Sequence, residues 1–362
     1  MLVLMIFVAF ICFLVIATYL FIQLPPFGRN PSGSRLQRIL KSSQYKTSGF
    51  ENIEPTTLMA EGASYPKMMK EFFSKGVDRE PTTALPFIKT DLTKLENNSL
   101  VWFGHSSYLL RVAEKSILVD PVFSERASPV QFAGMRAYRG TNNYRPEDMP
   151  ALDVIILTHD HYDHLDYNVI KSLHQRTKVF YTSLGVGQHL ERWGVPLEKI
   201  VEMDWWESHA VSDAIKLIAT PARHFSGRGL IRNKTLWSSF VLKTNDVSIF
   251  IGGDSGYDES FKKIGELYGP FDLVILESGQ YDQKWPQIHM APEEAVYACV
   301  DLKGKVMLPV HWGKFALALH PWTEPIVRVL KEAKQRNVTV ATPIIGETMS
   351  LLKEPPTKKW WP

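Results

Sequence analysis

The chain has 362 residues, of which 45% are hydrophobic and 22% charged, and its formal net charge is +3. This composition is typical of a folded globular protein and excludes disorder over most of the chain. The net charge is too small to indicate nucleic-acid binding, which usually requires a clustered basic surface. Cys12 and Cys299 are the only cysteines, so neither a disulfide framework nor a cysteine metal cluster is expected. A metal site in this chain must use histidine and carboxylate ligands.

The N-terminal segment from Leu2 to Leu24 contains no charged residue. About 20 apolar residues in a helix span the hydrocarbon core of a bilayer, and Pro25-Pro26 ends the run. The alternative is a cleavable signal peptide, which would need a basic residue before the run and a small-residue cleavage site after it. Because both features are missing, we predict an uncleaved, single-pass transmembrane helix over residues 1–24.

Basic residues follow this helix directly, at Arg29, Arg35, Arg38, Lys41 and Lys46. The positive-inside rule therefore places the rest of the chain on the cytoplasmic side of the membrane. Residues 25–98 are rich in proline, serine and glycine, with one predicted helix at Tyr65–Lys75. We expect this juxtamembrane linker to pack on the domain that follows it.

A compact pattern of strands and helices begins near residue 99 and defines a predicted domain over residues 99–352, with a C-terminal tail at 353–362. Short apolar runs predict strands at Val101–Phe103, Ser107–Val112, Ser116–Val119, Asp153–Leu157, Lys178–Tyr181, Ile215–Ala219, Val247–Ile251, Leu273–Leu276 and Val306–Val310. Helices are predicted at Asn168–Gln175 and Ala291–Val300. Five of the strands are followed by polar or metal-binding residues. Because ligands gather at the carboxyl ends of strands in α/β sheets, these residues should meet at one rim.

The segment Thr158–Asp166 follows the strand Asp153–Leu157 and contains the pattern His159-x-His161-x-Asp163-His164. A solvated polar loop is an improbable explanation, because three of the 11 histidines lie within six residues directly after a buried strand. Histidine nitrogen and carboxylate oxygen are ligands that zinc accepts. Four such ligands exceed what one catalytic zinc ion with an open position needs, so two adjacent metal ions are expected.

Further ligands are expected at later strand ends. His224 follows the strand Ile215–Ala219, Asp254 follows Gly252-Gly253, and His311 follows Val306–Val310. A single histidine after a strand is more often a structural hydrogen-bonding residue. As a set, however, these residues occupy the same topological position as the first cluster. Asp254 lies between glycines, which suits a carboxylate bridging two metal ions.

The seven residues together resemble the ligand pattern of the metallo-β-lactamase superfamily. This resemblance covers about residues 99–352 and implies an α/β fold, an αβ/βα four-layer sandwich with a dinuclear metal site at the sheet edge. It implies the following ligands: His159, His161 and His224 for the first metal ion, Asp163, His164 and His311 for the second, and Asp254 between them. The expected cofactors are two Zn²⁺ ions, although other divalent metals suit the same ligands.

A narrower resemblance is to the N-acylphosphatidylethanolamine-hydrolysing phospholipase D branch. It rests on segments inside and outside the metal pattern: Pro26–Gly28, Phe50–Asn52, Trp102–Ser106, Asp120–Phe123, His161–His164, Gly253–Tyr257, His289 with Pro292–Ala295, and His311–Gly313 with Phe315. The resemblance implies a phosphodiesterase of phospholipase D type acting on membrane phospholipids, with a bilayer as partner and a homodimer as its assembly. Asp163, Asp254 and His289 are the implied catalytic residues. The N-terminal anchor departs from the family pattern and leaves the lipid substrate open.

Other residues keep two interpretations. His105 and Asp120 are expected to orient metal ligands from behind. His289 either contacts a substrate phosphate or caps the helix Ala291–Val300. Trp205-Trp206 belongs either to the membrane interface or to the core. His174, His189, His209 and His320 are expected to be structural or on the surface. For the leaving-group proton the candidates are a metal-bound water, His289 and Asp163.

The alternative functions are a hydrolase of the same fold that acts on a lactone, amide or β-lactam, a nuclease, and a non-catalytic membrane protein that keeps metal for structure. The weak net charge disfavours the nuclease. The seven-ligand set disfavours a structural role, because structural zinc sites normally close with four ligands. The sequence thus predicts a membrane-anchored, dinuclear zinc hydrolase.

Overall fold

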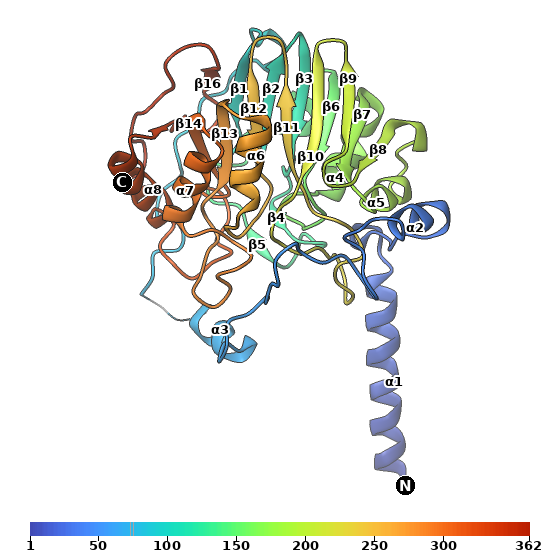
Figure 1. The fold of residues 1–362 in the computed structure, drawn as a ribbon. Helices are drawn as coiled ribbons and strands as arrows, with labels where there is room; N and C mark the ends of the chain where they lie inside the picture. The colour runs from blue at the N-terminus through green and yellow to red at the C-terminus, as the bar shows by residue number, and fades with distance from the viewer. Residues whose placement is uncertain (73, 75) are drawn as a thin grey trace.

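A computed structural model describes residues 1–72, 74 and 76–362. Its body is a sandwich of two seven-stranded sheets with helices on both outer faces (Figure 1). This is the αβ/βα four-layer arrangement predicted from the sequence. A long N-terminal helix, α1 (Leu2–Ile22), extends away from the body.

The first sheet has the strand order β16-β1-β2-β3-β6-β7-β8. Its strands are β1 (Ser99–Trp102), β2 (Tyr108–Val112), β3 (Lys115–Val119), β6 (Leu152–Leu157), β7 (Thr177–Ser183), β8 (Ile200–Met203) and β16 (Thr348–Ser350). From β16 to β3 neighbouring strands are antiparallel, whereas β3, β6, β7 and β8 are parallel. Its outer face packs against α4 (Tyr167–Leu173) and α5 (Gly187–Arg192).

The second sheet has the strand order β15-β14-β13-β12-β11-β10-β9. Its strands are β9 (Ser208–Ser212), β10 (Ile215–Thr220), β11 (Ser239–Lys243), β12 (Ser248–Ile251), β13 (Phe271–Glu277), β14 (Gly304–Val310) and β15 (Thr339–Val340). The first four are antiparallel and the last four parallel. Helices α6 (Ser260–Tyr268), α7 (Pro292–Asp301) and α8 (Glu324–Arg336) pack on its outer face. A small hairpin, β4 (Arg126–Ala127) and β5 (Met135–Arg136), stands apart.

The central strands of both sheets are mainly apolar because both of their faces are buried. In β6, Val154 and Ile156 face the core between the sheets, and Ile155 and Leu157 face the helix layer. Side chains alternate between the two faces of a strand, so one short run supplies two hydrophobic layers. Burying both faces fixes the register and thereby the place where each strand ends.

The predicted strands and helices of the body are all present, with bounds that differ by at most two residues. The predicted helix Tyr65–Lys75 is observed as α3 (Tyr65–Phe72), and Lys75 lies outside the described residues. The structure adds elements that the sequence analysis missed, including β8, β9, β11, α5, α6 and α8. One of them, β9, is mostly exposed and has no continuous apolar run.

The segment that follows α1 packs on the body and contains a helix that was not predicted, α2 (Gly33–Ile39). Ile39 and Phe50 of this segment are buried against Trp205 and Trp237. Trp205 is 5% exposed, and its indole N–H donates to the Trp237 carbonyl. The membrane-interface interpretation of Trp205 is therefore wrong, because this side chain belongs to the core.

Candidate metal centre

The metal-binding residues predicted from the sequence meet at one end of the sandwich, where the strands that carry them end. His159, His161, Asp163 and His164 lie on the loop that follows β6. The others come from the ends of strands of the second sheet: His224 after β10, Asp254 after β12 and His311 after β14. Residues up to 152 positions apart in the sequence are thus brought together.

The first cluster contains His159, His161, His224 and Asp254, whose candidate ligand atoms lie within 4.8 Å of one another. His161 Nδ1 lies 3.0 Å from His159 Nε2 and 3.2 Å from His224 Nε2. Asp254 Oδ2 lies 3.7 Å from Nε2 of both His159 and His224. Three nitrogens and one oxygen therefore surround one point, as a tetrahedral zinc site requires.

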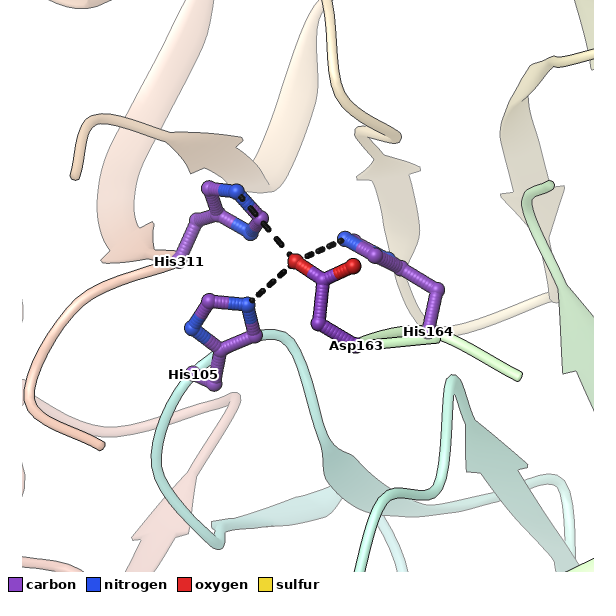
Figure 2. Close-up of side chains that lie close together, drawn as sticks. All are labelled: His105, Asp163, His164 and His311. Carbon is purple, nitrogen blue, oxygen red and sulfur yellow. Dashed lines mark hydrogen bonds and ion pairs between the residues drawn. The ribbon is translucent and has the colours of Figure 1, made fainter. Parts of the chain in front are cut away.

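The second cluster contains His105, Asp163, His164 and His311 (Figure 2). Three imidazoles converge on Asp163 Oδ2: His105 Nε2 at 3.0 Å, His164 Nε2 at 3.7 Å and His311 Nε2 at 3.9 Å. His105 was expected only behind the ligands. The structure places it in hydrogen-bonding contact with the ligand Asp163, on the same face as His311.

Asp254 lies between the two clusters. Its Oδ2 faces His159 and His224, while its Oδ1 lies 3.2 Å from His164 Nε2 and 3.3 Å from His311 Nδ1. One carboxylate oxygen thus points to each cluster. This is the arrangement that a carboxylate bridging two cations needs.

Hydrogen bonds behind the ligands determine which imidazole nitrogen is free. The Ile288 carbonyl can only accept, so His224 donates through Nδ1 at 2.8 Å and keeps a lone pair on Nε2. Thr158 Oγ1 donates to Asp120 at 2.6 Å, which leaves its oxygen to accept from His159 Nδ1 at 3.0 Å. Such outer partners fix the tautomer and the orientation of metal-binding histidines.

Asp120 organises the ligand loop from behind. Its carboxylate accepts from Thr158 N at 2.8 Å, from Thr158 Oγ1 at 2.6 Å and from His164 Nδ1 at 2.7 Å. Asp120, His105 and His311 all have left-handed backbone conformations, with φ of 40°, 52° and 67°. Such conformations carry a cost for residues with a side chain and concentrate at functional sites. Tertiary hydrogen bonds hold them here, including one from His311 N to the His105 carbonyl.

Among the described residues, several buried site atoms have no hydrogen-bond partner, including His164 Nε2, His311 Nε2 and Asp254 Oδ1. Leaving buried polar atoms unpaired costs about 1–3 kcal/mol each, so native structures rarely retain them without a reason. His164 Nε2 and Asp254 Oδ1 lie 3.2 Å apart, and His311 Nε2 lies 3.9 Å from Asp163 Oδ2. The residues therefore fit a pair of cations bound between them.

The protonation of the cluster supports the same interpretation. Burial lowers the pKa of His159, His224 and His311 well below the usual range, so these rings are neutral, as metal ligands must be. Burial also opposes the charging of His164, but the carboxylates of Asp254, Asp163 and Asp120 raise its pKa well above the usual range. The acidic groups of the site thus require positive charge.

His289 lies beside both clusters rather than at a helix cap. The N-cap of α7 is Ala291, whose N–H donates to Glu294, so the capping interpretation of His289 is wrong. The ring of His289 stacks on that of His311 with centroids 5.4 Å apart, and its Nδ1 lies 3.0 Å from Glu277 Oε1. Burial lowers the pKa of His289, but Glu277, and then Asp254 and Asp163, raise it to about 9.

Glu277 follows the predicted strand Leu273–Leu276, and the sequence pattern gave it no role. Its carboxylate is 1% exposed and also accepts from Met290 N at 3.1 Å. The signal was therefore present in the sequence, as a charged residue at the end of the otherwise mainly apolar strand β13. His174 and His320 are partly exposed and His209 is exposed, as expected for surface or structural residues. His189 is fully enclosed.

A cavity of about 290 Å³ lies over the ligands. Its floor includes His161, Asp163, Asp254 and His289. Its walls are mainly apolar and come from the linker, the β10–β11 loop, the segment before α7 and the loop between β14 and α8: Leu58, Met59, Tyr65, Met68, Phe225, Trp285, Ile288 and Leu317. Arg232 and Gln280 are its polar wall residues.

The comparisons with known proteins agree with this geometry. The family model described as the β-lactamase superfamily domain matches residues 115–312. The chain belongs to the β-lactamase superfamily. It is 38% identical over 328 residues to an uncharacterized protein of Mycobacterium tuberculosis, covering 89% of this chain and 88% of that protein.

The likeness to the phospholipase D branch is also confirmed. The chain is 33% identical over 229 residues to N-acyl-phosphatidylethanolamine-hydrolyzing phospholipase D 1 of Caenorhabditis elegans, which covers 60% of this chain and 64% of that protein. Among solved structures, Igni18, a metallo hydrolase of Ignicoccus hospitalis, shares the fold with a TM-score of 0.53 at 21% identity; the match covers 69% of this chain and 97% of Igni18. The protein is therefore a metal-dependent hydrolase of this superfamily.

Proposed function

We propose that the protein is a dinuclear zinc phosphodiesterase of phospholipase D type that acts on N-acylphosphatidylethanolamine-like membrane phospholipids. The Caenorhabditis elegans relative supports this choice of reaction, although the match spans only part of each chain. Nitrogen and oxygen ligands at two adjacent points suit zinc, and they also accept other divalent metals.

The observation that carries the proposal is the contrast between the floor and the walls of the cavity. The floor presents the metal ligands and His289, which suit an anionic phosphodiester. The walls present Leu58, Met59, Phe225 and Leu317, which suit an acyl chain. A small polar lactone would leave much of this apolar wall without a contact. The shape and chemistry of the cavity therefore favour an amphipathic lipid.

Each ligand has a defined task in the proposed reaction. His159, His161 and His224 would hold one cation, Asp163, His164 and His311 would hold the other, and Asp254 would contribute to both. When bound, such a pair of cations activates water for attack and neutralises charge on the phosphodiester. Asp120 and Thr158 keep His164 and His159 in the tautomers whose free nitrogens face the site. His105 donates to Asp163 and limits its rotation.

His289 contributes a hydrogen-bond donor beside the cations. Glu277 accepts from its Nδ1 and orients the ring over the floor of the cavity. A phosphodiester oxygen on this floor is a suitable acceptor for the imidazole, because charge-assisted hydrogen bonds to phosphate are strong. His289 is therefore the protein residue placed best to assist the departing alkoxide.

The anchor fits a substrate that resides in a bilayer. Helix α1 has 21 residues and is long and apolar enough to cross a membrane. None of its residues is buried against the body. Two of the basic residues behind the predicted cytoplasmic orientation are ion-paired: Arg35 with Glu202 and Arg38 with Glu207. Because topology is set during insertion, before these pairs form, we retain the cytoplasmic orientation.

The test is lipid mass spectrometry on the purified, zinc-loaded full chain in mixed micelles that contain N-acylphosphatidylethanolamine. We expect phosphatidate and N-acylethanolamine to accumulate together. In the variant Asp254→Asn, turnover should fall by more than about 100-fold. Losing a residue that only supports a metal ligand costs about 10–100-fold, and Asp254 is proposed to be a ligand itself. Asp213→Asn is the matched control, since Asp213 is exposed in the turn between β9 and β10.

The same protein should be offered nitrocefin and a panel of lactones. If the wild type binds two zinc ions but releases no phosphatidate, the phospholipase D proposal is wrong. Turnover of a lactone or amide under those conditions would establish the alternative, a hydrolase of the same fold with a different substrate.

A further inference from the structure

The backbone of the linker just after α1 is held by a set of side chains that lie directly behind the metal-ligand loop. We call this set the seat, and its members are His189, Arg192, Trp193 and Arg228. The Trp193 indole N–H donates to the Pro25 carbonyl at 2.7 Å. Arg228 donates to the Pro26 carbonyl through Nη2 at 2.8 Å and through Nε at 3.1 Å. Arg192 donates to the carbonyls of Gln23 and Gly28.

At Gly28 the linker backbone packs directly against His189. This residue has φ of +69°, and a Cβ atom added to it would lie 2.0 Å from His189 Nδ1. The next residue, Arg29, donates its backbone N–H to the same nitrogen at 3.0 Å. Because a backbone N–H can only donate, His189 Nδ1 carries the lone pair and the ring proton is on Nε2.

The other side of His189 reaches the metal loop. Its Nε2–H donates to Asp160 Oδ2 at 3.1 Å, and Asp160 is the residue between the ligands His159 and His161. Thr235 Oγ1 donates to the same oxygen at 2.9 Å, and Gly227 N donates to Oδ1 at 2.7 Å. Asp160 is 2% exposed, so its carboxylate is held by these donors instead of water.

Arg228 strengthens the same connection through the backbone. Its Nη1 donates to the Asp160 carbonyl at 2.7 Å and to the Leu165 carbonyl at 2.8 Å, which are the two ends of the segment that carries three ligands. Arg228 is 4% exposed, and its guanidinium stacks over the Tyr162 ring, 4.1 Å from the ring centroid. A single side chain thus binds both the linker and the metal loop.

We propose that His189 is a positioning residue that transmits the placement of the linker at Gly28 and Arg29 to Asp160, and so holds His159 and His161 in the geometry that retains metal. A displacement of the segment that follows the anchor should therefore also displace the metal ligands. This inference rests on the metal centre of the proposed function, and it does not depend on the identity of the substrate.

The experiment measures zinc release from the full chain in detergent micelles, loaded with Zn²⁺ alone and mixed with a chromophoric chelator. Gly28→Ala inserts a methyl group against His189 from outside the metal site. We expect about tenfold faster release, the lower end of what displaced outer partners cause. Gly33→Ala is the matched control, because Gly33 also has positive φ (+58°) but a Cβ there meets nothing within 4 Å.

Two variants of His189 test the same contact from the other side. His189→Leu removes both the acceptor and the donor and should speed release as Gly28→Ala does. His189→Gln keeps one acceptor and one donor on an amide and should largely restore the slow release. Thermal unfolding of the metal-free proteins separates a loss of fold stability from an effect on the metal centre. If His189 had only a structural role, its variants would lower the melting temperature of the metal-free protein without changing the rate of zinc release at 25 °C.

Equal release rates for wild type, Gly28→Ala and Gly33→Ala, with two zinc ions bound in each, would overturn the coupling alone. A wild type that binds no zinc would overturn the coupling together with the metal centre. If His189→Leu does not fold, Gly28→Ala and His189→Gln still decide the question.

Discussion

Replacing Asp120 with asparagine tests whether this carboxylate controls the metal centre. Asp120 is 1% exposed and accepts three hydrogen bonds, one at Oδ1 from Thr158 N and two at Oδ2 from Thr158 Oγ1 and His164 Nδ1. An asparagine of the same shape has only one acceptor oxygen. Its amide nitrogen must therefore face one of these donors in either orientation of the side chain.

Each of the two orientations of the asparagine amide disrupts one of these hydrogen bonds. With the amide nitrogen at the Oδ1 position, it meets Thr158 N–H, and a buried unpaired donor costs about 1–3 kcal/mol. With the nitrogen at the Oδ2 position, His164 Nδ1 must become an acceptor, and the ring proton moves to Nε2. That nitrogen lies 3.2 Å from Asp254 Oδ1 and would lose the lone pair needed for metal. We expect the affinity of the second zinc ion to fall by about 10–100-fold.

The assay is competition for Zn²⁺ with a chelator of known affinity at pH 7.5, fitted for two sites. Asp153→Asn is the control. Asp153 of β6 accepts from the backbone N–H of Ser116 in β3 at 3.1 Å, so it also joins these two strands, but away from the ligands. A second-site affinity in Asp120→Asn equal to that of the control would refute the assigned role of Asp120.

Two further predictions concern buried side chains, and a third concerns the N-terminal helix. Lys314 is fully buried, and this burial lowers its pKa from the ordinary 10.5 to about 7. Above pH 7 and below the ordinary pKa, the unfolded chain therefore binds more protons than the folded chain, so the unfolding free energy should rise by roughly 2 kcal/mol between pH 7 and pH 9. Lys314→Met should remove this rise in urea unfolding, and an unchanged pH slope would contradict it. Trp361 in the C-terminal tail is 5% exposed, and its ring centroid lies 5.6 Å from that of Trp312. Trp361→Ala should therefore lower the free energy of unfolding by about 3–5 kcal/mol and lower the melting temperature. An unaltered melting curve would show that the tail is dispensable for stability. Alkaline washing should leave the full chain in the membrane pellet with Met1 intact, whereas a new N-terminus near residue 24 would reveal a cleaved signal.

Local sequence patterns were enough to predict the strands that carry the site. Asp153–Leu157 is a continuous apolar run because β6 is buried on both faces, and the observed strand begins only one residue earlier. Edge and solvent-facing elements were missed for the opposite reason: β9 has exposed side chains and lacks that signal. The seven predicted ligands do meet in the structure, because each follows a strand that ends at the same rim.

The sequence by itself determined the chemistry of this protein: histidine and carboxylate ligands after buried strands, and an apolar helix of membrane-spanning length. Only the tertiary structure decided how these groups act together. It placed one oxygen of Asp254 toward each cluster, joined His289 to Glu277 rather than to a helix cap, and enclosed His189 between the linker and Asp160. Each of these contacts joins residues from different elements, where the distance and the free lone pair depend on how the two sheets pack. Spacing along the chain specifies which groups are available, whereas packing specifies which atoms face each other.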